Sequence, residues 1–322
     1  HLQIIGLIGS DGILSIAERM NNVSVNSPLM GFLKAPTIVW WFRSDWALRG
    51  LTWLGMIGSG LLLFDVIPKL MVTMLWFLYL SLLWAGSPFL SYQWDLLITE
   101  TLFLSIFLAP GTVLPGAKRA PPSRISVLLL QVLLFKLMFL GGAAKLSSGD
   151  PTWWNGTALA YHFETQPLPT PLAWFMDKLP MMVLGIGVLF MFLSELIAPW
   201  FVLVRSKISR WATGLIVSLQ LLIMMTGNYG TFNLLSIWLC LMVFQDRSLP
   251  QAKPSRSFSA ETLGLSSTRI SQGRWRFWTE TPLLVVVLIF NVTIVCSQFG
   301  VNLRLGPMED AWQGIRQFRS IN

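Results

Sequence analysis

Charged residues are scarce in this sequence. Asp, Glu, Lys and Arg make up 12% of its 322 residues, whereas 54% are hydrophobic and 16 are tryptophan. Soluble domains carry about 25% charged residues, so this composition indicates a polytopic membrane protein. The net charge of +8 does not predict a nucleic-acid partner, because the basic residues lie in short loops between apolar runs.

Cysteine and histidine are also rare, and each shortage excludes a kind of site. The two cysteines, Cys240 and Cys296, lie inside apolar runs and are not the disulfide framework of a small secreted protein. The two histidines are His1 and His162, whereas a metal site needs three or four ligands. We therefore predict buried free thiols, no metal site and no cofactor.

The common catalytic motifs are missing as well. The sequence contains no Gly-x-Ser-x-Gly, no phosphate-binding glycine loop and no Cys-x-x-Cys. The absence of these motifs therefore favours a protein that is not an enzyme.

Long apolar runs are the dominant positive feature. A membrane-spanning helix needs roughly 20 predominantly apolar residues. Eight segments reach or approach this length: 46–64, 68–86, 92–109, 125–146, 181–203, 210–228, 231–245 and 279–299. We predict an all-α integral membrane bundle over residues 46–299 with about eight transmembrane helices, of which 231–245 is the shortest.

The basic residues predict the orientation of the bundle. The loops on one side contain Lys69, Lys118, Arg119, Arg124, Arg205, Lys207, Arg210, Arg247, Lys253, Arg256, Arg269, Arg274 and Arg276. The internal loops on the other side contain only Lys178. By the positive-inside rule the first side is cytoplasmic. The N-terminal segment 1–45 and the C-terminal segment 300–322 then lie on the non-cytoplasmic side, with the bacterial inner membrane favoured and the ER membrane expected in a eukaryote.

Two loops are long enough to have a role of their own. The cytoplasmic loop 246–277 is rich in Ser, Pro and Arg and reads as a flexible linker. The non-cytoplasmic loop 147–180, called the aromatic loop below, is rich in Trp, Phe and Pro. We expect it to be ordered and partly embedded at the membrane interface, with Trp153, Trp154, His162 and Glu164 as its candidate site.

A few charged residues fall inside the predicted spans. At about 1.5 Å per residue, Lys136 lies about 16 Å from the inner edge of its span, Glu100 about 12 Å from the outer edge and Glu195 about 12 Å from the inner edge. These depths allow Lys136 to pair with Glu100 or Glu195. The sequence favours an interhelical clamp, and a proton or ion path is the alternative.

A second charged group is predicted at the non-cytoplasmic mouth of the bundle. It contains Arg49, Asp95, Lys145 and Glu164. Lys145 is nine residues from Lys136, so the two lysines face opposite sides of one helix. Two interpretations of Lys145 remain open. Its ammonium extends to the membrane surface, or it loses hydration among the aromatic residues, which favours the neutral amine that can serve as a base.

Several runs of sequence resemble the lipase maturation factor family, and we take the chain as a bacterial-type member. The runs are 93–97 with Glu100, 149–154, 161–169 and 226–233. The resemblance implies a polytopic membrane protein; eukaryotic members reside in the ER and help dimeric lipases reach their active form. The family pattern also leads us to expect a further membrane helix before His1 and a soluble β-rich domain after Asn322.

A shorter run, 141–146 followed by Trp153, Trp154 and Gly156, is similar to a segment of the vitamin K-dependent γ-carboxylases and related multi-helix membrane proteins. That resemblance places Lys145 at the position of a catalytic base.

Three hypotheses of function follow. The first is a maturation factor or membrane chaperone whose aromatic loop contacts a lipase-like client. The second is a membrane enzyme that uses Lys145 as general base on a lipid or a membrane-proximal peptide. The third is a structural subunit of a larger membrane assembly. Membrane lipids are expected partners in all three.

Overall fold

The computed structural model describes residues 3–22, 27–116, 121–204, 206–248, 266–299 and 301. Helices form most of this part of the chain, and no named β-strand occurs within it; one isolated antiparallel bridge joins Pro169 and Gly227. The described residues divide into two compact units, the first ending at Pro122 and the second beginning at Ser123. The prediction of an all-α membrane protein is confirmed.

The first unit combines three short helices with three long ones. These are α1 (Ile4–Ile8), α2 (Ile16–Asn22), α3 (Pro28–Lys34), α4 (Asp45–Leu63), α5 (Pro68–Gly86) and α6 (Gln93–Leu108), with a 3-10 turn at Ile38–Trp40. Ser44 caps α4 by accepting a hydrogen bond from the backbone N–H of Ala47. The short helices pack on α4 and α5 around Ile8, Ile16 and Trp40.

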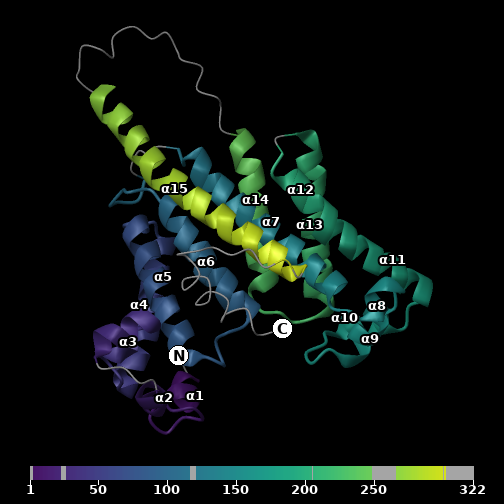
Figure 1. Ribbon diagram of the computed structural model, residues 1–322, viewed down its shortest axis with the longest axis horizontal. Coiled ribbons are helices and arrows are strands. Elements are labelled where there is room, and N and C mark those ends of the chain that lie inside the picture. The colour runs from purple at the N-terminus through teal and green to yellow at the C-terminus, as the bar shows by residue number, and fades with distance from the viewer. Residues whose placement is uncertain are drawn as a thin grey trace. The chain divides into compact units, whose positions relative to one another are not determined.

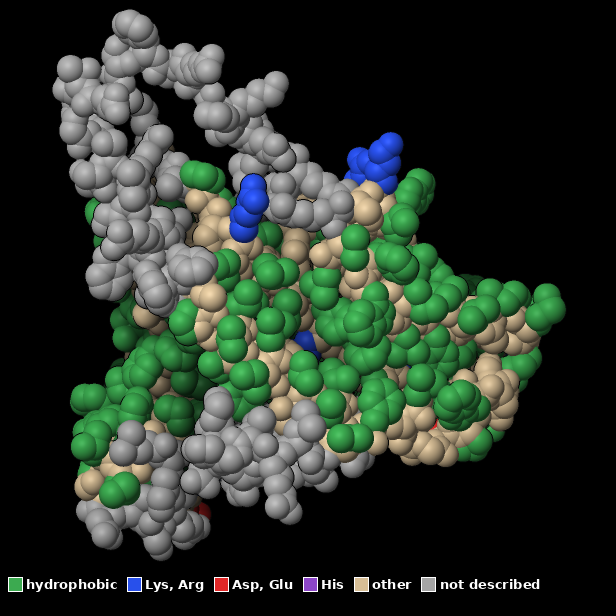
Figure 2. All heavy atoms as spheres, turned by 45° about the horizontal axis from the view of Figure 1, so that its top comes forward, with side chains coloured by type: hydrophobic (Ala, Val, Ile, Leu, Met, Phe, Trp, Pro, Cys, Tyr) green, Lys and Arg blue, Asp and Glu red, His purple; other side chains and the backbone are tan. Residues whose placement is uncertain are grey.

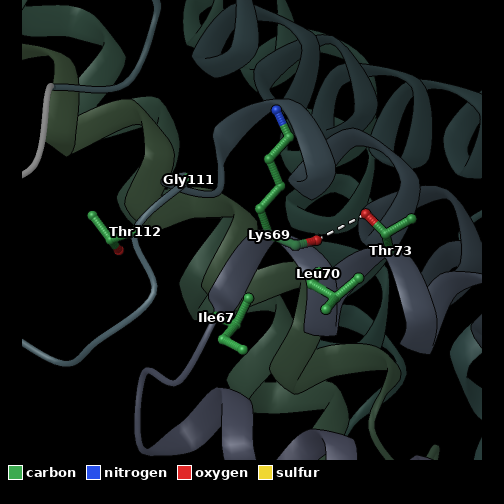
Figure 3. A pocket seen from close by; sticks show the side chains of 6 residues that line it. All are labelled: Ile67, Lys69, Leu70, Thr73, Gly111 and Thr112. Carbon is green, nitrogen blue, oxygen red and sulfur yellow. Dashed lines mark hydrogen bonds between the residues drawn. The ribbon is translucent and has the colours of Figure 1, made fainter.

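A shallow pocket lies beside the tight turn between α4 and α5. Asp65 and Ile67 adopt positive φ there. The pocket has a volume of about 360 Å³ and is lined by Ile67, Lys69, Leu70, Thr73, Gly111 and Thr112. Figure 3 shows the side chain of Lys69 extending away from Ile67 and Leu70, while its carbonyl accepts a hydrogen bond from the hydroxyl of Thr73. No convergent set of polar groups lines this pocket, so we do not treat it as the functional site.

The second unit is organised around α7 (Arg124–Ser147). The other helices are α8 (Pro151–Trp154), α9 (Ala158–Thr165), α10 (Pro171–Asp177), α11 (Met181–Phe192), α12 (Ala198–Val202), α13 (Lys207–Thr226), α14 (Phe232–Ser248) and α15 (Ser266–Gln298). A π-helical turn, η2 (Leu193–Ile197), joins α11 to α12. The central helix α7 contacts η2, α12, α14 and α15 (Figure 1). Its buried face includes Leu129, Leu133, Leu134 and Met138.

A helix lies at each of the eight predicted spans, but the count of eight stays a prediction. Within the described part of the chain, six helical stretches are long and apolar enough to cross a membrane: Asp45–Leu63, Pro68–Gly86, Arg124–Ser147, Met181–Val202, Lys207–Thr226 and Glu280–Ser297. The remaining two are shorter, since α6 has 16 residues and the apolar part of α14 ends at Phe244. Hydrophobic side chains cover most of the described surface seen in Figure 2, as expected of helices that face lipid.

The predicted linker 246–277 is only partly described. Helix α14 continues to Ser248 and α15 already begins at Ser266, so helices reach into both ends of the predicted linker, and the flexible linker itself stays a prediction. Residues 249–265 lie outside the described residues, as does most of the C-terminal segment 300–322.

Candidate functional site

An ion pair joins the last turn of α7 to the π-helical turn η2. The Nζ of Lys145 lies 2.5 Å from Oε2 of Glu195. The side chain of Glu195 is 9% exposed and that of Lys145 is 26% exposed. Each group neutralises the other in an apolar environment, where a single buried charge would be costly.

The π-helical turn presents Glu195 to α7. A π turn is rare and occurs frequently at functional sites. Pro199 follows four residues after Glu195, and a proline cannot donate a hydrogen bond to the carbonyl four residues before it. The local sequence therefore favours a departure from α-helical bonding at the turn that carries the carboxylate.

Two adjacent glycines of α7 allow η2 to approach closely. A Cβ on Gly142 would lie 2.7 Å from Cδ2 of Leu196 and 3.0 Å from Cβ of Glu195. A Cβ on Gly141 would lie 3.6 Å from Oε2 of Glu195, which is ordinary contact. Small residues commonly let membrane helices come close together, and Gly142 does so here.

Trp153 of α8 covers the lysine. The Nζ of Lys145 lies 5.7 Å from the centroid of the Trp153 ring, within the range of a cation–π contact. The same ring makes an edge-to-face contact with Phe192, with centroids 6.2 Å apart. Trp153 thus connects the ammonium to α11 and fixes the first helix of the aromatic loop against the bundle.

His162 and Tyr229 form the other side of the site. The hydroxyl of Tyr229, in the connection between α13 and α14, lies 3.5 Å from Nε2 of His162 on α9. Burial, and then the positive charge of Lys145, lowers the pKa of His162. Burial also raises the pKa of Tyr229. Both shifts favour the neutral form of the side chain, and the charge of Lys145 acts on His162.

The aromatic loop is attached to the end of α13 a few residues further on. The Thr170 hydroxyl donates to the carbonyl of Met225 at 2.5 Å, and Pro169 pairs with Gly227. Beside these contacts, Nε2 of Gln166 is buried without a hydrogen-bond partner among the described residues. These contacts attach the loop to the bundle, and Gln166 leaves one donor of this site unused.

We expect the neutral state of His162 to make stability depend on pH. Because its folded-state pKa is lowered, the folded protein binds fewer protons than the unfolded chain below about pH 6.5, the ordinary value for histidine. The stabilising contribution is therefore complete above that pH and is lost as pH falls through it toward the lower folded-state pKa. Thermal unfolding in detergent should show a larger drop between pH 7.5 and 5.5 for the parent than for His162→Gln; equal drops would contradict the expectation.

The other predicted site residues are distributed as follows. Trp154 and Glu164 are exposed on the aromatic loop, whereas Trp153 and His162 turn inward. In the first unit, buried Asp95 accepts a hydrogen bond from the Tyr79 hydroxyl at 2.6 Å and caps α6 through the N–H of Tyr92. The guanidinium of Arg49 lies over Trp46, 5.6 Å from the ring centroid. These contacts, all within the first unit, give Asp95 and Arg49 structural roles. The charged group predicted at the non-cytoplasmic mouth of the bundle stays a prediction.

Glu195 lies beside a different lysine from the one considered for it from the sequence. It contacts Lys145, whereas the sequence left Glu100 and Glu195 open as alternative partners of Lys136. The depth estimate assumed that the two helices start and end level with each other. In the structure, a turn 12 residues into the α11 segment packs against the end of α7, and the first part of α11 packs against α9 instead. The clamp between Lys136 and Glu100 stays a prediction.

The arrangement defines an ion pair shielded by aromatic residues at the junction of membrane helices and an ordered loop. Among the described residues, no group of three or more His, Cys, Asp and Glu side chains could hold a metal ion. Tyr229, Gln166 and Glu195 were not recognised as members of this site from the sequence. Tyr229 lies in a run that carries the family resemblance, but nothing local to that run indicates its contact with His162.

These features define a polytopic helical membrane protein with a charged site beneath an ordered loop. The family model of the lipase maturation factor transmembrane domain matches residues 1–251, and the chain belongs to the lipase maturation factor family. It is 38% identical to lipase maturation factor 2 of Mus musculus over 98% of this chain and 49% of the relative. It is 36% identical to lipase maturation factor 2 of Homo sapiens over 81% of this chain and 39% of the relative. Lipase maturation factor 1 of Bos taurus is 32% identical over 77% of this chain and 46% of its own length.

The chain spans less than half the length of these relatives. No solved structure matches it. The bacterial assignment and the likeness to the γ-carboxylases stay predictions.

Proposed function

We propose that this chain is the membrane part of a factor that helps a secreted lipase-like client reach its active form. Membership of the lipase maturation factor family carries the proposal. It is supported by the aromatic loop, which is ordered and tied to the bundle at Lys145, His162 and Thr170. We place the loop on the non-cytoplasmic side, in the bacterial inner membrane or, in a eukaryotic cell, in the ER membrane.

The client contact is proposed for the exposed side of α8 and α9. Trp154 is 69% exposed and Tyr161 is 58% exposed, and Glu164 is exposed nearby. Trp153 and His162 face the bundle instead, where they hold the loop in position. The surface therefore combines aromatic area with one carboxylate, which suits an apolar and partly basic surface on a partly folded client.

A reconstitution experiment tests this proposal. A secreted lipase is expressed in cells that lack their own family members, with and without this chain, and the specific activity of the secreted lipase is measured. We expect the chain to raise that activity, and the double change Trp154→Ser with Glu164→Ala to remove most of the gain. Trp211→Ala is the matched control, because Trp211 is 81% exposed but lies in the first turns of the span α13. Lipase activity that is the same with and without the chain would contradict the proposal.

The enzyme hypothesis is less well supported by the geometry. A general base must offer a free lone pair, whereas the ammonium of Lys145 is bonded to Glu195 and covered by Trp153. The same contacts explain Lys145 as the residue that joins α7, η2 and α8. The third hypothesis, a subunit of a larger assembly, predicts that the chain purifies with one fixed complex.

A further inference from the structure

Helix α10 (Pro171–Asp177) exposes aromatic side chains although it is part of an ordered loop. Trp174 is 62% exposed and Phe175 is 60% exposed. The preceding residue, Ala173, is 1% exposed and faces the bundle. The helix thus has one face against protein and an adjacent face that is aromatic and bare.

Both ends of α10 are tied to membrane-spanning helices. At its N-terminal end, the backbone N–H of Thr170 donates to the carbonyl of Thr226, the last residue of the span α13. At its C-terminal end, only residues 178–180 separate Asp177 from Met181, where the span α11 begins. The four Cα–Cα steps from Asp177 to Met181 span at most about 14 Å, so α10 lies near the level where two spans leave the bilayer. Helix α10 packs against α9 and α13, and Figure 1 shows it next to α9.

The span α11, which follows α10 in the chain, also has an exposed apolar side. Met181 and Met182 are 54% and 75% exposed, and Ile186 and Leu189 continue the exposed apolar row along the helix. A row at this helical spacing on a membrane span faces lipid. Lys178 lies between the two helices, with Nζ 6.0 Å from the centroid of the Trp174 ring and 2.5 Å from Oδ2 of Asp177.

We propose that α10 lies on the membrane, with Trp174 and Phe175 inserted at the boundary between lipid headgroups and acyl chains, in the leaflet on the side of the aromatic loop. Tryptophan is enriched at that boundary because its ring is apolar and its N–H is polar. The ammonium of Lys178 extends from this level toward the phosphates. The aromatic loop is then divided: α10 rests on lipid, and α8 and α9 stay free for a protein client. The proposal stands independently of the client assignment, since it rests only on exposure and on the two flanking spans.

Site-directed fluorescence in lipid vesicles tests the proposal without any client. The full chain carries Cys240→Ala and Cys296→Ala, plus a single cysteine from Trp174→Cys or Phe175→Cys that is labelled with an environment-sensitive fluorophore. The control is Glu164→Cys on the neighbouring helix α9, since an exposed carboxylate marks a water-facing position. The vesicles contain phosphatidylcholine with or without a nitroxide near the headgroup end of its acyl chain, and iodide serves as the aqueous quencher.

We expect labels at 174 and 175 to emit at shorter wavelength than the label at 164, to be quenched by the nitroxide lipid and to lose sensitivity to iodide. The label at 164 should show the reverse. Labels at 174 and 175 that iodide quenches as strongly as the label at 164 would overturn the proposal. Protection from both quenchers would overturn it as well, because a second protein copy would then cover the face.

Discussion

Replacing Glu195 with glutamine is expected to destabilise the bundle strongly. The substitution keeps the shape of the side chain but removes the charge that neutralises Lys145 at 2.5 Å. Leaving one member of a buried ion pair unpaired costs about 3–5 kcal/mol. The side chain of Lys145 is 26% exposed, which allows some rehydration, so we expect a loss near the lower limit, about 3 kcal/mol in the free energy of unfolding. Reversible unfolding in detergent or bicelles would measure it.

A double-mutant cycle separates the pair from other effects of the substitution. Lys145→Met alone should also destabilise the fold, and Lys145→Met combined with Glu195→Leu should recover part of the loss, because no buried charge then remains. The pair between Lys178 and Asp177 has the same 2.5 Å distance but a lysine side chain that is 62% exposed, so it serves as a control. Asp177→Asn should leave the midpoint of unfolding unchanged, since water already solvates Lys178. Additive single changes at Lys145 and Glu195 would show that the two charges do not interact.

Much of the fold could be predicted because it depends on local sequence. Apolar runs of about 20 residues place helices within a bilayer whatever their neighbours are, and each of the eight predicted runs contains a helix. The aromatic and proline content of the aromatic loop predicted an ordered segment, and that stays a prediction. The start of α15 at Ser266 could not be predicted, because its first turns lie in a polar stretch that composition alone assigns to a linker.

The site was predicted less completely because it depends on which helices pack together. The sequence indicated that Lys145, Trp153 and His162 matter, and the structure brings all three together. It did not indicate Glu195 as the partner of Lys145, since depth along straight, level helices places them far apart. The π-helical turn and the close approach at Gly142 bring them together, and both depend on contacts between distant parts of the chain.

Enlarging Gly142 to leucine is expected to separate α7 from η2. A Cβ at this position would already lie 2.7 Å from Cδ2 of Leu196 and 3.0 Å from Cβ of Glu195, and the rest of a leucine side chain has no room between the helices. Overpacking of this kind costs about 1–3 kcal/mol. Moving η2 away also breaks the ion pair between Lys145 and Glu195, so the total loss should reach about 3 kcal/mol or more. The measurement is the free energy of unfolding under the conditions used for Glu195→Gln.

The neighbouring glycine provides the matched control. Gly141→Ala adds a methyl group 3.6 Å from Oε2 of Glu195, which is ordinary contact, and alanine favours a helix over glycine by up to about 1 kcal/mol. We therefore expect Gly141→Ala to keep or raise stability, and Gly142→Ala to fall between it and Gly142→Leu. If Gly142→Leu and Glu195→Gln act through the same lost ion pair, combining them should cost clearly less than the sum of the single changes. Full additivity would mean that the close approach at Gly142 does not control the ion pair.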